Sequence, residues 1–249
     1  RISGLAPDAA VVVTTVRALK VHSGRYLVKP GKPLSEDLKK EDVRAIEEGI
    51  GNLRRHLENV RKHGVPAVVA LNRFPTDSEA EIEAVLSLAR ESGAHQAVVS
   101  DVHARGGQGG EELAHAVLNA SEEKANFHYL YPDEISIVEK IETIAREIYG
   151  ADGVDFEPAA RRACVRYEKM GMGRLPVCMA KTQYSFSDDP RKVGAPTGFR
   201  VQVRELHVSA GAGFLYAICG DMMTMPGLGT RPALLGIDLD AQGEIQGLF

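Results

Sequence analysis

The chain has 249 residues, of which 44% are hydrophobic and 26% are charged, and its formal net charge is −4. This is the composition of an ordinary globular protein, without the basic patch or stripe that usually marks a nucleic-acid surface. Its apolar runs stop well short of the roughly 20 residues that cross a bilayer. We therefore expect a protein that has neither nucleic acid nor a membrane as a partner.

The sequence starts at Arg1 without an initiator methionine, and a strand is expected almost at once, so we interpret it as a piece of a longer chain. The three cysteines, Cys164, Cys178 and Cys219, form no CxxC pair, and we expect buried free thiols rather than a disulfide framework. Free thiols are typical of a reducing compartment. We expect this compartment to be the cytoplasm, with the mitochondrial matrix as an alternative.

Strands and helices alternate in the first half of the chain. Apolar, β-branched runs predict strands at residues 9–14, 65–71 and 94–100. Apolar residues at three- and four-residue spacing predict helices at 41–63, from Asp77 or Ser78 to 92, and at 111–123, and a glycine-, proline- and lysine-rich stretch predicts a loop at 22–39. This alternation is typical of a parallel sheet, which binds its ligands at the carboxyl ends of its strands. Two loops, at residues 72–77 and 101–110, are expected at that edge.

The second half of the chain has a different pattern. It contains a strongly amphipathic stretch at residues 136–150, and Pro158 can begin another helix that ends near residue 171. Shorter strands are predicted at residues 175–180, 199–208 and 214–218. The predicted fold class is therefore α/β, with a Rossmann-like parallel-sheet domain followed by a smaller mixed α+β domain.

The loop Asn72-Arg73-Phe74-Pro75-Thr76-Asp77 follows the apolar run at residues 65–71. One interpretation is a plain strand-to-helix turn, in which Pro75 sets the corner and Asp77 caps the next helix. The other gives Phe74 a function, because an aromatic ring in a polar loop can stack on a planar ligand. The local pattern favours the turn. It also excludes the guanine-reading Asn-Lys-x-Asp loop, because Pro75 stands where that loop needs its aspartate.

The second loop, at residues 101–110, contains His103 and four glycines ahead of a predicted helix. Glycines permit close backbone approach to a ligand, and a helix start presents free N–H groups to an anion. Neither GxGxxG nor GxxxxGK[ST] is satisfied, however, so the loop is weak support for phosphate binding. His103 by itself is more typical of a surface or capping histidine than of a catalyst.

No phosphate-binding loop is recognisable elsewhere in the sequence. The Gly31-Lys32 pair is followed by Pro33 and lacks the earlier glycine that the motif requires. The eight histidines show neither HxxxH nor HExxH spacing, so no zinc site is predicted. The methionine-rich stretches and Cys178 are expected to be structural. We predict no catalytic and no metal-binding residue, and we assign no nucleotide-binding residue.

Several distinctive motifs follow one another along the chain. They are TVRALK at 15–20, NRFPTD at 72–77, GGQGG at 106–110, IYGAD at 148–152, LPVCMAKT at 175–182, SAGAGF at 209–214, MTMPGL at 223–228 and GLF at 247–249. In this combination and order the chain resembles the C-terminal half of formate–tetrahydrofolate ligase, also called 10-formyltetrahydrofolate synthetase. The resemblance covers nearly all of the sequence.

The resemblance implies a ligase that joins formate to tetrahydrofolate with ATP, Mg²⁺ and a monovalent cation, giving 10-formyltetrahydrofolate. It also implies three parts: residues 1–52 as a remnant of the large nucleotide-binding domain, 53–147 as a Rossmann-like folate-binding domain and 148–249 as a C-terminal α+β domain. The phosphate-loop part is expected outside this chain, as a missing N-terminal half, so the chain alone is expected to be inactive. A homo-oligomer is expected because the family is often oligomeric.

The resemblance also assigns a pterin site. Phe74 matches the aromatic residue that stacks on the pterin ring, and the opposite wall, a tryptophan in the family, is His103 in this sequence. Imidazole offers much less stacking area than indole. A non-catalytic folate-binding or assembly homologue is therefore the alternative to an enzyme fragment.

Five more residues belong to the predicted pterin site. Asn72 and Asp101 would orient polar edges of the ring or would cap their own loops, and the sequence leaves these alternatives open. Pro75, Gly106 and Gly107 complete the site.

The first strand and the residues after it, 9–20, would lose their sheet neighbours without the large domain. We therefore expect an exposed, adhesive strand edge there.

Overall fold

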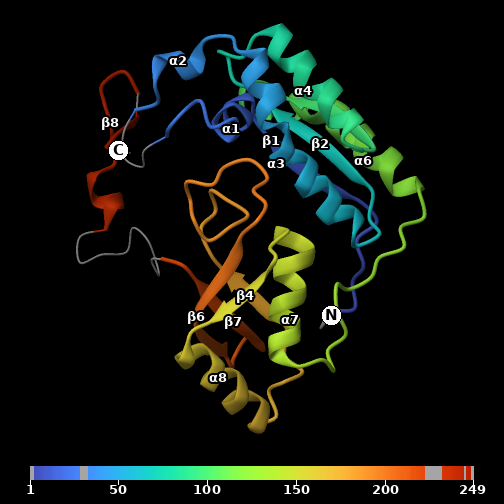
Figure 1. Cartoon of the computed structure of the whole chain (residues 1–249). Coiled ribbons are helices and arrows are strands. Elements are labelled where there is room, and N and C mark those ends of the chain that lie inside the picture. The colour runs from blue at the N-terminus through green and yellow to red at the C-terminus, as the bar shows by residue number, and fades with distance from the viewer. Residues whose placement is uncertain (1–2, 29–32, 222–231, 244, 248–249) are drawn as a thin grey trace.

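A computed structural model describes residues 3–28, 33–221, 232–243 and 245–247, and Figure 1 shows the course of the chain. The MTMPGL motif at 223–228 and the last two residues lie outside this described part. The described residues form a three-stranded sheet, a four-stranded sheet and a two-stranded hairpin. The predicted α/β class is confirmed, because the first sheet is parallel, the second is mixed and helices cover both.

The first sheet has the order β1-β2-β3, with every neighbouring pair parallel. Its strands are β1 (Ala10–Thr14), β2 (Ala67–Asn72) and β3 (Gln96–Ser100). The helices of this unit are α1 (Val16–His22), α2 (Glu36–Lys39), α3 (Val43–Arg61), α4 (Glu79–Glu91), α5 (Val102–Arg105) and α6 (Glu111–Glu122), with a 3₁₀ turn at Gly106–Gly110 between the last two. All three predicted strands and all three predicted helices of the first half are present, with ends that differ by a few residues.

Apolar side chains divide between the two faces of this sheet. Leu53 and Leu57 of α3 pack with Val69 and Leu71 of β2 in a core that α1 and α4 also enter. Val68 points to the opposite face, where a smaller cluster joins it to α6. β2 is therefore buried on both sides, which explains its uninterrupted apolar run.

No element was predicted for residues 15–21, between the first strand and the expected loop, but Val16–His22 form α1. Thr15 starts this helix by accepting a hydrogen bond from the Ala18 N–H group at 3.0 Å. Seven residues give too few turns for a clear apolar periodicity. The expected loop also contains the short helix α2.

β1 forms one edge of the parallel sheet. Val11 and Val13 are 42% and 65% exposed, so one face of this edge strand is open to solvent. Val16 and Leu19 of α1, by contrast, are buried.

The second sheet has the order β4-β6-β7-β5, in which the central pair β6–β7 is antiparallel and the two outer pairs are parallel. Its strands are β4 (Gly153–Phe156), β5 (Val177–Ala180), β6 (Arg200–Ser209) and β7 (Phe214–Cys219). It packs against α7 (Ile137–Ile144), which continues as a π-helical turn at Ala145–Tyr149, and against α8 (Pro158–Lys169). Near the C-terminus lie a 3₁₀ turn at Ala233–Gly236 and the hairpin of β8 (Asp238–Leu239) and β9 (Ile245–Gln246).

Two sequence expectations for the second unit need correction. β4 was not predicted, because four residues between two helices give no periodic signal. Cys164 and Cys219 are buried free thiols as expected, but Cys178 is exposed. It lies on the edge strand β5, where every second side chain points away from the core.

The loop between β5 and β6, drawn in orange in Figure 1, reaches from the second unit toward α3. The amide of Asn52 donates to the Gly194 carbonyl at 3.1 Å, and the Gly194 N–H group donates to His22 Nδ1 at 3.1 Å. The division at residues 52 and 147 stays a prediction. α3 continues without interruption from Val43 to Arg61, across the first of these positions.

None of the helices in the described ranges is both long enough and apolar enough to cross a membrane.

Candidate functional site

The loop at residues 72–77 is a closed turn. Pro75 occupies the second position of this turn, which its fixed φ favours, and the Asp77 N–H group donates to the Phe74 carbonyl at 3.0 Å. The Asp77 carboxylate in turn accepts from the Phe74 N–H group at 2.8 Å. Asp77 therefore closes the loop, whereas Ser78 caps α4, in a reciprocal capping box with Glu81.

Phe74 is half-buried and belongs to none of the hydrophobic clusters of the described residues. One face of its ring is covered by the guanidinium of Arg17, whose Cζ lies 4.0 Å from the ring centroid. Arg17 Nη2 also donates to the Thr76 hydroxyl at 3.0 Å. Arg17 was not among the predicted site residues, since nothing in the local sequence pattern joins it to Phe74.

A buried ion pair lies behind this loop. Lys20 of α1 contacts Glu81 of α4, and both side chains are 1% exposed. The Lys20 ammonium also donates to the carbonyls of Leu38 at 3.1 Å and Lys40 at 2.6 Å, and Glu81 accepts from the Asp42 N–H group at 2.9 Å. Burial acts to raise the pKa of the Glu81 carboxyl, but the hydrogen bonds from Lys20 and the backbone hold it below its ordinary value.

The stretch at residues 101–110 is more regular than a glycine loop. It forms α5 and the 3₁₀ turn, closed by a 3.0 Å hydrogen bond from the Asp101 N–H group to the Gly109 carbonyl. Gly106 has φ +59°, which favours glycine, whereas a Cβ on Gly107 would meet nothing within 4 Å. His103 is exposed on α5.

The start of α6 is a poor anion site. Its first turn already contains Glu111 and Glu112, whose charges take the place that an anion would occupy at a helix N-terminus. This geometry agrees with the sequence analysis, in which the glycine-rich loop was weak support for phosphate binding.

The two loops begin side by side at the carboxyl edge of the sheet. Asn72 pairs with Ser100 in the strand register, and the Arg73 N–H group donates to the Ser100 carbonyl at 3.1 Å. Asn72, Phe74 and Pro75 lie in the first loop, and the other four predicted site residues lie in the second: Asp101, His103, Gly106 and Gly107. No ring contact joins Phe74 and His103 in the described part of the chain.

Comparison with known proteins decides the family. The family model for formate–tetrahydrofolate ligase matches residues 1–249. The chain belongs to the formate–tetrahydrofolate ligase family. It is 53% identical over 248 residues to the formate–tetrahydrofolate ligase of Saccharopolyspora erythraea, covering all of this chain and 44% of that protein. The ligases of Symbiobacterium thermophilum and Cutibacterium acnes are 55% and 52% identical over 250 and 249 residues, covering all of this chain and 43% and 44% of theirs.

The chain therefore spans less than half the length of these relatives. The resemblance that the motifs indicated is confirmed. The motif NRFPTD of this family member is the closed loop that presents Phe74, and TVRALK places Arg17 over the ring.

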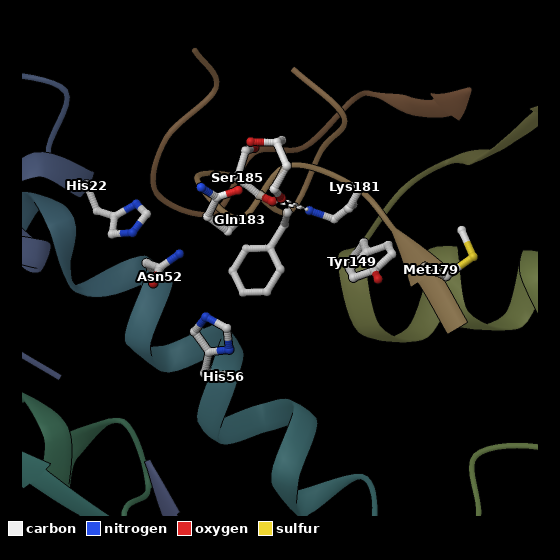
Figure 2. Close-up of a pocket in the computed structure, with 10 residues that line it drawn as sticks. His22, Asn52, His56, Tyr149, Met179, Lys181, Gln183 and Ser185 are labelled. Carbon is white, nitrogen blue, oxygen red and sulfur yellow. Dashed lines mark hydrogen bonds between the residues drawn. The ribbon is translucent and has the colours of Figure 1, made fainter. Parts of the chain in front are cut away.

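This formate–tetrahydrofolate ligase family member also has a pocket that the sequence did not predict. The pocket has a volume of about 290 Å³. In Figure 2, His22, Asn52 and His56 lie on one side of it, and Tyr149 and Lys181 lie on the other. Burial lowers the pKa of both histidines, and the Lys181 ammonium donates to three carbonyls of its own loop. Neither of the two candidate loops lines this pocket.

No group of three histidine, cysteine, aspartate or glutamate side chains in the described ranges is placed to hold a metal ion. These residues therefore contain no cluster that would hold Mg²⁺ by protein side chains alone.

Proposed function

We propose that this chain supplies the tetrahydrofolate-binding part of a formate–tetrahydrofolate ligase, which joins formate to tetrahydrofolate with ATP to give 10-formyltetrahydrofolate. The observation that carries the proposal is Phe74, an aromatic ring outside every described core cluster at the carboxyl edge of a parallel sheet. Ligands of such sheets bind at that edge. Family membership and the relatives' names, which include tetrahydrofolate, support the pterin of tetrahydrofolate as the partner of this ring.

Each predicted site residue has a role in this proposal. The face of Phe74 opposite Arg17 stacks on the pterin, and His103 forms the other wall of the site. Asn72 and Asp101 hold polar edges of the ring, Pro75 fixes the corner of the loop, and Gly106 and Gly107 leave room for the ligand. The open space around Gly107 supports this last role.

ATP has to be bound elsewhere in the complete enzyme. We place the phosphate loop, with Mg²⁺ and the monovalent cation, in an N-terminal half that joins this chain covalently or as a second chain. The parallel-sheet unit is then the Rossmann-like folate domain, and the mixed-sheet unit is the C-terminal domain. A homo-oligomer and a cytoplasmic location belong to the same proposal.

Calorimetric titration with tetrahydrofolate tests the site. We expect the unmodified chain to bind and Phe74→Ala to weaken binding roughly 10- to 100-fold, since stacking of an aromatic side chain contributes about 1.5–3 kcal/mol. Tyr184→Ala is the matched control, because it removes an exposed ring from the other unit. Equal affinity of the chain and of Phe74→Ala would contradict the proposal.

The second wall has its own variant. His103→Trp supplies the larger ring of the family and should tighten tetrahydrofolate binding several-fold. An unchanged dissociation constant would exclude residue 103 from the site.

An alternative function is a non-catalytic folate-binding or assembly subunit, favoured by the exposed imidazole at position 103. Joining the chain to a cognate N-terminal half separates the two functions. ATP-dependent formylation by the joined protein supports the enzyme, and binding without turnover supports the alternative.

A further inference from the structure

Arg17 stands at an unfavourable place for a cation. It is the second residue of α1, where the partial positive charge of the helix N-terminus repels a guanidinium, and no acidic residue accompanies it in that turn. No carboxylate forms an ion pair with it among the described residues. A cation placed against the helix dipole and without an acidic partner indicates a role other than the stability of α1.

The contacts of Arg17 all lead to the candidate site. Its guanidinium lies over the Phe74 ring, with Cζ 4.0 Å from the ring centroid, and Nη2 donates to the Thr76 hydroxyl at 3.0 Å. Its Nε is buried and has no hydrogen-bond partner in the described part of the chain. The nearby charge also acts on Asp77, where it opposes the rise in pKa that burial causes.

α1 cannot easily slide away from this position. Lys20 lies one helical turn after Arg17, and its buried contact with Glu81 joins α1 to the start of α4. α4 begins directly after the Phe74 loop. By joining the two helices, the ion pair therefore holds Arg17 in place against Phe74.

We propose that Arg17 is a specificity-determining residue of the pterin site, selecting the electron-rich, reduced pterin ring over its oxidised form. This inference rests on the proposed function of Phe74. The guanidinium occupies one face of the phenyl ring, so the ligand stacks on the opposite face. A cation on one side draws π-electron density toward itself, which reduces the repulsion between the far face and an electron-rich ligand ring.

Substitutions at Arg17 separate charge from packing. Arg17→Met keeps an apolar cover on Phe74 without charge, and Arg17→Lys keeps the charge without the planar stack and the fork of donors. Arg73→Met is the control, since this neighbouring arginine pairs with the exposed Glu79 and covers no ring among the described residues. Each variant is titrated calorimetrically with tetrahydrofolate and with folate, its oxidised counterpart.

We expect Arg17→Met to weaken tetrahydrofolate binding about five- to tenfold and folate binding at most twofold, so that the ratio of the two affinities falls. Arg17→Lys should lie between the unmodified chain and Arg17→Met, and Arg73→Met should match the unmodified chain. A purely structural role would weaken both ligands equally, and this outcome would overturn the inference, as would an unchanged ratio.

The two proposals fail in different ways. One outcome is that Phe74→Ala loses binding while Arg17→Met keeps the ratio of tetrahydrofolate to folate affinity. This outcome supports the pterin site and overturns the role of Arg17. Binding that is unaffected by Phe74→Ala, or absent from the unmodified chain, overturns both.

Discussion

The two loops at the carboxyl edge of the parallel sheet differ in how much side chains contribute to holding them. At residues 72–77, side chains reinforce the backbone turn: the Asp77 carboxylate accepts from the Phe74 N–H group, and Arg17 donates to the Thr76 hydroxyl. At residues 101–110, backbone groups hold one another, and the Asp101 N–H group donates to the Gly109 carbonyl. Removal of a side chain should therefore destabilise the first loop, and addition of a side chain should destabilise the second.

The largest expected effect comes from the ion pair behind the first loop. Lys20→Met leaves the Glu81 carboxylate buried without its cation, which should lower the free energy of unfolding by about 3–5 kcal/mol. The pKa of Glu81 is held below its ordinary 4.5, so the pair stabilises the fold above that pH. This contribution is lost as the pH falls through the lowered pKa. Urea denaturation of both proteins at a series of pH values measures it.

Two further variants sharpen this prediction. Lys39→Met removes the cation of the exposed Glu36–Lys39 pair and should change stability far less, because water screens that pair. The double variant Lys20→Met with Glu81→Leu should recover part of the loss, because no unpaired charge remains. Similar losses in Lys20→Met and Lys39→Met would show that burial of the pair has no energetic weight.

The second loop should be broken by a single methyl group. A Cβ on Gly109 would lie 2.2 Å from the Asp101 carbonyl oxygen, so Gly109→Ala has to displace backbone and should cost about 1–3 kcal/mol. Gly107→Ala is the control, because a Cβ there meets nothing within 4 Å. Thermal unfolding of the two variants should differ clearly, and equal midpoints would contradict the backbone-held description of this loop.

Asp77 gives a smaller effect that depends on pH. Burial raises the pKa of its carboxyl above the ordinary 3.8, while the Phe74 N–H group and Arg17 act in the opposite direction. The folded state then binds this proton more tightly than the unfolded state, so stability falls as the pH rises from 3.8 through the raised pKa. Asp77→Asn keeps an acceptor and cannot ionise. It should therefore gain stability relative to the unmodified chain over that interval.

Asp77→Ala removes the acceptor altogether and should cost about 1–2 kcal/mol, because the Phe74 N–H group loses its partner. Denaturation curves at pH values from about 4 to 7 give both results. Parallel pH profiles for the unmodified chain and Asp77→Asn would show that the carboxyl titrates alike in the folded and unfolded states.

Long, periodic segments were the predictable part of this fold. α3 has 19 residues and five turns of regularly spaced apolar side chains, and β2 is an unbroken apolar run. α1 and β4 were missed because seven and four residues contain too little pattern. The order of strands in the mixed sheet depends on contacts between distant segments, which no local window contains.

The residues of the candidate site were also predictable only in part. Phe74 could be selected because an aromatic ring was out of place in a polar loop. Arg17 could not, since it lies 59 positions from Thr76 and meets the loop only after α1 packs on α4. Position 109 requires glycine because the Asp101 carbonyl lies too close for a Cβ, whereas position 107 has room for one. The sequence of glycines alone does not distinguish these two positions.

The contact of the β5–β6 loop with α1 and α3 has a consequence for how the molecule melts. Gly194 both accepts from Asn52 and donates to His22, and the ring of Phe186 lies 4.7 Å from that of His56. Loss of either sheet removes the surface on which this loop rests. We therefore expect these contacts to couple the stabilities of the two units. Heat or denaturant should then melt the two sheets and their two cores in one transition.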